Sequence, residues 1–163
     1  DEICHRDILK RFSSFEKDRV VRVSRLESIT DLADIVFSHA VLEHVYNLEE
    51  VLRALRMHLK TSACMIHSVD YRDHFNKYPF HFLQFSNTAW RRFLNPGDLT
   101  RHRISDHIRS FCDSGFSVEV LDRKSDMKGY GRIKKHVHRD FLRYPPEDLT
   151  TVSAILFVVN ERG

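Results

Sequence analysis

The chain has 163 residues, enough for one hydrophobic core and a single domain. Its net charge of +3, from 26 basic and 23 acidic residues, is too small and too dispersed to predict a nucleic-acid partner. No apolar run reaches the length of a membrane span, and the first residues do not resemble a signal peptide, so no membrane partner is expected. Three widely spaced cysteines without a CxxC pair indicate unpaired thiols in a reducing compartment, the cytoplasm: Cys4, Cys64 and Cys112.

The first third of the chain reads as alternating elements of an α/β fold. A helix is expected over residues 6–15, a short strand over 20–23, and a loop with a helical turn over 24–32. Residues 33–38 (ADIVFS) are mostly apolar and β-prone, as in a strand buried on both faces of a parallel sheet.

Three polar side chains follow that strand within one short turn: His39, Glu43 and His44. Ligands of open α/β sheets bind beyond the carboxyl ends of the strands. The turn is therefore a candidate site, although Glu43 and His44 can equally serve to hydrogen-bond the loop that precedes the next helix.

The next helix begins at Asn47, a favourable N-cap with Glu50 three residues later. An apolar stripe at helical spacing runs on to Leu59, which predicts a helix ending near Lys60. Residues 63–69 then read as a strand.

A second polar cluster, Asp70 to His74, follows the strand at 63–69. Two strands joined by a crossover helix should be parallel, so both polar clusters should open into the same crevice. Asp73 can orient His74 as a base, or it can pair with Arg72 to anchor the following segment. His67, within the strand, is interpreted as a buried histidine of the core or of the surroundings of the site.

The second half of the chain continues the α/β pattern. Residues 75–100 are rich in aromatics and predict a lid with a short helix over 87–93, and a helix over 105–114 has Ser105 as its cap and Gly115 as its stop. Two more strands are expected over 116–121 and 152–159, separated by a basic excursion, residues 122–149, that contains a helix.

Several segments together resemble one enzyme family. VFSHAVLEHV (36–45), HSVDYRDHF (67–75), FLQFSNTAW (82–90) and the arginines at 101 and 103 are similar to class I S-adenosylmethionine (SAM)-dependent methyltransferases of type 11. The resemblance implies a Rossmann-like fold whose last two strands are antiparallel, SAM as cofactor, and methyl transfer to a small-molecule or glycan-like acceptor.

The glycine-rich loop by which that family holds SAM has no counterpart before residue 33, since the five glycines stand at 97, 115, 129, 131 and 163. We therefore expect the C-terminal half of the domain, without the N-terminal strands and inactive by itself. The strand at 33–38 would then expose an edge that a second copy can cover, giving a homodimer. A non-catalytic module for protein association is the alternative.

The resemblance also implies roles for single residues. Ser38, His39 and Ala40 would line the methionine end of the cofactor, and His44 would face the acceptor. A methyl transfer to a hydroxyl mainly needs alignment of the two reactants and a nearby base. His44, His74 and Asp73 are accordingly the catalytic candidates.

The candidates for substrate binding are Glu43, Asp70, Trp90 and Arg103. Trp90 can stack on a planar acceptor or belong to the core of the lid. Arg101 and Arg103 can clamp an anion or fasten a loop. Some relatives bind a divalent ion through ExxEH at the position of residues 40–44, but Ala40 replaces the first glutamate, so no metal is predicted.

Overall fold

The computed structural model describes residues 25–95, 97 and 99–160. The chain divides into two compact units, residues 1–30 and 31–163. The helix predicted over 6–15 and the strand predicted over 20–23 lie outside the described residues. The described part of the first unit contains the 3-10 turn η2 (Leu26–Ser28), which agrees with the helical turn expected there.

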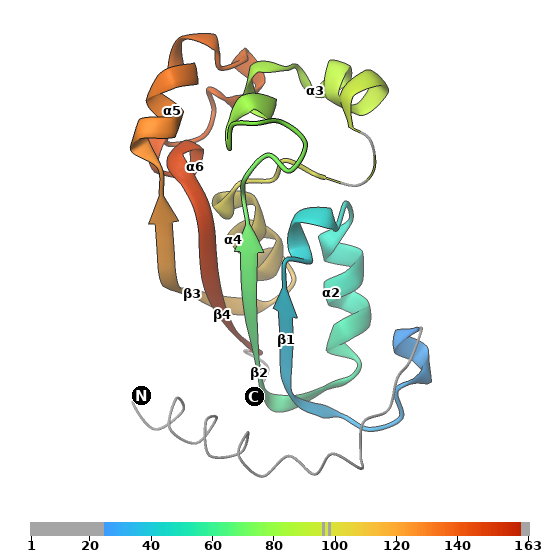
Figure 1. Cartoon of the computed structure of the whole chain (residues 1–163). Helices are drawn as coiled ribbons and strands as arrows, with labels where there is room; N and C mark the ends of the chain where they lie inside the picture. The colour runs from blue at the N-terminus through green and yellow to red at the C-terminus, as the bar shows by residue number, and fades with distance from the viewer. Residues whose placement is uncertain (1–24, 96, 98, 161–163) are drawn as a thin grey trace. The chain divides into compact units, whose positions relative to one another are not determined.

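A four-stranded sheet forms the centre of the second unit, in the order β1 (Ala33–His39), β2 (Leu59–Asp70), β4 (Thr151–Asn160) and β3 (Phe116–Ser125) (Figure 1). β1 and β2 are parallel, and β4 runs antiparallel to both β2 and β3. The antiparallel pairing of the last two strands is thus confirmed. The described sheet is mixed rather than mostly parallel, because only β1 and β2 are joined through a crossover helix.

β1 is less buried than its apolar sequence predicted. Each of its residues is either half-buried or exposed, and Phe37 is 50% exposed. Within the described part of the chain, β1 is hydrogen-bonded to β2 alone, so it lies at an edge of the sheet instead of inside it. The homodimer expected through this edge stays a prediction.

Helix α2 (Leu48–Arg56) crosses from β1 to β2 and begins as expected, with the Asn47 side chain accepting a hydrogen bond from the Glu50 N–H. It ends at Arg56, earlier than predicted, and Leu59 is the first residue of β2. The parallel pairing explains this end, because the Ala33 N–H donates to the His58 carbonyl, 2.7 Å away, and the chain must already have turned there.

Helix α4 (Ile104–Asp113) begins one residue earlier than predicted, and Ser105 is not its cap. The Asp106 carboxylate accepts the backbone N–H of Arg103 at 2.8 Å, which satisfies one of the donors at the start of the helix. Gly115 ends the helical region with φ +78°, as the sequence indicated. A side chain at Gly115 would also collide with the guanidinium of Arg56, which donates to the Gly115 carbonyl.

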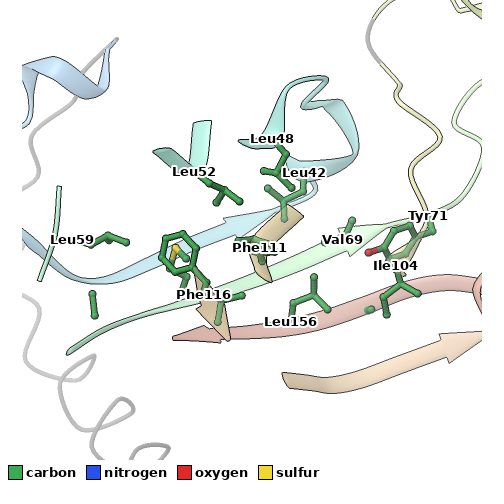
Figure 2. Packing of buried hydrophobic residues seen from close by; sticks show 14 residues of the cluster. Leu42, Leu48, Leu52, Leu59, Val69, Tyr71, Ile104, Phe111, Phe116 and Leu156 are labelled. Atoms are coloured by element: carbon green, nitrogen blue, oxygen red, sulfur yellow. The ribbon is translucent and has the colours of Figure 1, made fainter. Parts of the chain in front are cut away.

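Helices α2 and α4 pack on one face of the sheet and enclose what we call the sheet core (Figure 2). Most of its side chains are aliphatic and come from regular elements, and α4 and the start of β3 add two phenylalanines. The labelled members are Leu42, Leu48, Leu52, Leu59, Val69, Tyr71, Ile104, Phe111, Phe116 and Leu156.

A second hydrophobic cluster, the lid core, lies beyond the carboxyl ends of β1 and β2, at the top of Figure 1. Its segments are the lid, with η4 (His81–Gln84), α3 (Asn87–Ala89) and the π-helix η5 (Trp90–Leu94), and the excursion, with α5 (Met127–Ile133), η6 (Lys134–His136), η7 (Arg139–Phe141) and α6 (Pro146–Thr150). Aromatic residues dominate it: Phe80, Phe82, Leu83, Trp90, Leu99, Tyr130, Ile133, Phe141 and Leu149. Among the helices of the described ranges, none is long and apolar enough to cross a membrane.

Candidate functional site

The turn that follows β1 is held in a fixed shape by the neighbouring strand. Ala40 adopts φ 52°, an uncommon left-handed conformation for a residue with a side chain, and its N–H donates to the Ser68 carbonyl of β2. The 3-10 turn η3 (Leu42–His44) comes next and buries Leu42 and Glu43. The conformation at Ala40 therefore sets the direction in which the two following titratable side chains leave the sheet.

The structure brings His44 and His74 together. Their ring centroids lie 5.5 Å apart, with His44 contributed by η3 after β1 and His74 by the loop after β2. This proximity follows from the parallel pairing, because the carboxyl ends of β1 and β2 meet at the same edge of the sheet. Two imidazoles in such a position bring their ring nitrogens, which can donate and accept hydrogen bonds, to one end of the sheet.

The carboxylate beside His74 belongs to Asp70 and not, as predicted, to Asp73. Asp70 Oδ2 lies 3.6 Å from His74 Nε2, and it also accepts two hydrogen bonds from the Arg72 guanidinium. Burial alone would raise the pKa of Asp70. The hydrogen bonds and charge of Arg72, together with the charge of His74, outweigh burial and lower this pKa. The ion pair expected between Arg72 and Asp73 is therefore replaced by one between Arg72 and Asp70.

Asp73 is buried and serves the backbone of the lid. Its carboxylate accepts the N–H groups of Phe75, Asn76 and Phe82 and the side-chain amide of Asn76, at 2.7 to 2.9 Å. These four donors occupy both carboxylate oxygens, which explains why Asp73 does not orient His74.

Glu43 is the most unusual carboxylate of the site. Its side chain is 3% exposed, and neither oxygen has a hydrogen-bond partner among the described residues. Burial raises the pKa of Glu43, and nearby backbone N–H groups and His44 offset part of the rise. A buried carboxyl without partners is costly unless it is protonated or bound to a ligand. Glu43 can therefore accept a hydrogen bond from a bound molecule as a carboxylate, or donate one to it as a protonated carboxyl.

Two buried imidazoles lie beneath this turn. Their hydrogen-bond partners could not be read from the sequence. His67 Nδ1 is hydrogen-bonded to the Ser38 hydroxyl at 2.7 Å, and His107 Nδ1 to the Tyr71 hydroxyl at 2.8 Å. Burial lowers the pKa of His67 to about 4 and that of His107 to about 3. Both are neutral at physiological pH, so they shape the floor of the site and carry no charge there. The interpretation of His67 as a buried histidine agrees with this position.

The three residues predicted to line the cofactor differ in accessibility. Ser38 is half-buried and bonded to His67, whereas His39 and Ala40 are exposed at the end of β1. The described residues thus offer exposed backbone at a strand end beside an unpartnered carboxyl, which fits one wall of a cofactor site.

Two of the predicted substrate-binding residues are structural. Arg103 is 0% exposed, and its guanidinium donates to the carbonyl oxygens of Tyr71, Asp148 and Thr151, so it cannot clamp a substrate. Trp90 is 2% exposed and its Nε1–H donates to the Leu99 carbonyl at 3.1 Å, so its ring belongs to the lid core and is no open stacking surface.

Two hollows open on the lid, and one of them is bordered by His74. One, of about 620 Å³, is bordered by His74, Arg72, Lys77 and Asp126, among others. The other, of about 330 Å³, lies between the lid and the excursion. Tyr46, two residues after His44, is one of its lining residues. Sequence patterns gave no signal for either hollow, because each combines segments far apart in the chain.

Within the described ranges, no group of three or more His, Cys, Asp or Glu side chains is arranged so that it could hold a metal ion. Glu43 and His44 are adjacent, but the pair lacks the further ligands that a stable site requires.

No family model and no curated protein matches the sequence. Solved structures do match its fold. One is the Haloferax volcanii Trm112 methyltransferase activator in complex with a protein named as a methyltransferase, at 15% identity and a TM-score of 0.50, covering 94% of this chain and 66% of that one. Others are a Listeria monocytogenes protein named as a SAM-dependent methyltransferase (12% identity, TM-score 0.49, 95% and 76% covered) and Bacillus subtilis YcgJ (11%, 0.49, 85% and 69%). The Haloferax match shows that the chain has a methyltransferase-like fold, and the chain spans about two thirds of the length of that protein.

Proposed function

We propose that this chain is the C-terminal portion of a SAM-dependent methyltransferase that acts on a hydroxyl of a small-molecule or glycan-like acceptor. The observation that supports it most is the pairing of His44 and His74 at 5.5 Å, at the carboxyl ends of two parallel strands in a methyltransferase-like fold. When bound, SAM supplies an electrophilic methyl group, and Ser38, His39 and Ala40 are the residues that would hold its methionine end.

The side chains of the site have separate tasks in this proposal. His74 is the general base that takes the acceptor hydroxyl proton on an imidazole nitrogen, and Asp70, 3.6 Å from its Nε2, stabilises the imidazolium that forms. His44 packs against His74 and faces the acceptor. Glu43, buried and without a partner among the described residues, is placed to hydrogen-bond a polar group of a bound molecule.

Methyl transfer from radiolabelled SAM into the small-molecule fraction of a cell extract tests the proposal in the natural protein. His74→Ala and His44→Ala should each lower turnover by about 10²-fold or more, with the affinity for SAM little changed. His136→Ala, at an exposed histidine of the excursion, is the matched control and should be near wild type. Equal losses of turnover and SAM affinity would assign the histidines to the shape of the loop instead.

A non-catalytic role in protein association is the second candidate. The Haloferax protein of similar fold is in a complex with an activator protein. Absence of SAM binding by the natural protein in titration calorimetry, together with no label transfer, would favour this candidate.

A further inference from the structure

The 330 Å³ cavity between the lid and the excursion has a lining of unusual charge. Three guanidinium groups border it, those of Arg91, Arg101 and Arg143, against a single carboxylate, that of Asp140. The Asp140 carboxylate already accepts the Asn87 N–H at 2.7 Å. The cavity therefore has an excess of positive charge.

Arg101 forms the buried part of this lining. It is 4% exposed, and its guanidinium lies over the rings of Trp90 and Phe141, at 5.0 and 4.8 Å from their centroids. It donates to the carbonyls of Phe82 and Phe85 and to the Asn87 side-chain oxygen, but its Nε has no hydrogen-bond partner among the described residues. Burial lowers the pKa of Arg101 to about 10, so it still carries its charge at neutral pH.

The remaining lining supplies neutral hydrogen-bonding groups. The Tyr144 hydroxyl receives a hydrogen bond from Arg143 and donates to Asp106. Burial lowers the pKa of His102 and so favours its neutral imidazole. Thr100 joins the cavity to the site, since its N–H and hydroxyl both donate to the Glu43 carbonyl. One lining residue of the cavity is thus hydrogen-bonded to the turn that holds His44.

We infer that this cavity binds an oxyanion, a phosphate or a carboxylate, carried by the acceptor molecule. That the anion belongs to the acceptor molecule rests on the proposed function. That the cavity binds an anion rests on the cavity alone. Guanidinium groups bind both oxyanions through paired, charge-assisted hydrogen bonds, and a buried guanidinium with an unpartnered N–H favours an anionic ligand over a neutral one. The anionic end would lie between the lid and the excursion while the reacting hydroxyl extends toward His74.

Trp90 provides a built-in probe, because it is the chain's one tryptophan and lines the cavity. Its fluorescence should change saturably when inorganic phosphate or acetate is added, but not with sodium chloride at equal ionic strength. Tighter binding of phosphate would identify a phosphorylated acceptor, and tighter binding of acetate a carboxylated one. A lack of saturable change with either anion overturns the inference.

Substitutions at the exposed arginines distinguish anion binding in the cavity from attraction of anions to positive charge elsewhere on the surface. Arg91→Gln and Arg143→Gln should each weaken anion binding about tenfold, because each removes one charge-assisted contact. Arg92→Gln is the matched control, since Arg92 is the next residue of the same π-helix and does not line the cavity. Equal weakening by Arg92→Gln overturns the inference. Arg101→Lys should also weaken anion binding, because it keeps the positive charge but loses the planar set of guanidinium N–H donors.

Anion titration and the label-transfer assay together distinguish the failure of one proposal from the failure of the other. Label transfer from SAM without anion binding would overturn the cavity's role and leave the methyltransferase intact. Anion binding without SAM binding or label transfer would support the cavity as an anion site and count against the methyltransferase.

Discussion

The sheet core and the lid core bury hydrophobic side chains by different means. The sheet core is mostly aliphatic and lies between strands and two amphipathic helices, whose backbone groups are paired within regular structure. The lid core is mostly aromatic and lies among short turns, whose backbone groups depend on the buried charged side chains of Asp73, Arg101 and Arg103. Burial of apolar area thus stabilises the first, whereas the second also needs specific charge-assisted hydrogen bonds.

Replacing Arg103 should have the largest effect, because this residue joins the two regions. Arg103→Met keeps much of the apolar volume but leaves the carbonyl oxygens of Tyr71, Asp148 and Thr151 without their donor. We expect the free energy of unfolding in urea to fall by about 4 kcal/mol. Arg92→Met, at an exposed position, is the control and should change it by less than about 0.5 kcal/mol. Similar values for the two variants would contradict the role given to Arg103.

Loss of Asp73 should affect the lid alone. Asp73→Ala removes the acceptor of four hydrogen bonds, and we expect a loss of about 3 kcal/mol in the stability of the lid. Hydrogen exchange should accelerate over residues 75–85 and stay slow in β2 and β4. Equal acceleration in the strands would show that the two cores unfold as one unit.

Acid should destabilise the sheet core. The unfolded chain protonates His67 and His107 near pH 6.5, whereas the folded protein does so only near pH 4 and pH 3, respectively. The unfolded state therefore binds more protons in this window, and stability falls as the pH decreases below 6.5. Each imidazole should account for up to about 2 kcal/mol between pH 6.5 and 5.

His107→Gln tests this pH dependence, because the variant keeps a polar group near the Tyr71 hydroxyl without titrating. Unfolding free energies measured at pH 6.5 and pH 5 should differ by about 2 kcal/mol less in the variant than in the wild type. Other titrating groups, Glu43 included, cancel in this comparison. An unchanged pH dependence would mean that His107 is not kept neutral by the fold.

The smallest effect is expected at the cap of α2. Asn47→Ala removes the side-chain acceptor of the Glu50 N–H and should lower stability by about 1 kcal/mol in thermal or urea unfolding. Asn47→Asp, which keeps the acceptor, should restore most of this loss. No change in Asn47→Ala would show that the cap contributes nothing.

Local signals in the sequence predicted the parts of the fold that depend on neighbours along the chain. Three such signals each depend on only a few neighbouring residues: the cap at Asn47, the end of the helix at Gly115 and the apolar run of β1. The meeting of His44 with His74 also could be predicted, because parallel pairing of two consecutive strands fixes which strand ends share an edge.

Contacts between distant segments could not be predicted in the same way. Whether Asp70 or Asp73 lies beside His74 depends on how the lid folds back to offer its N–H groups, and the Phe82 donor is nine residues away from Asp73. The sequence left open whether Arg103 clamps an anion or fastens a loop, because its carbonyl partners, at 71, 148 and 151, leave no pattern of residue types; the structure shows the second role. The arginine-lined cavity was missed for the same reason.

The order of strands has a consequence for the synthesis of the protein. β4 is the last described strand along the chain, yet it lies between β2 and β3 and pairs with both. During synthesis β2 and β3 therefore leave the ribosome before β4 does. Until β4 emerges, each has an unpaired edge that can misassociate. Chaperone demand should therefore be greatest just before residues 151–160 leave the ribosome.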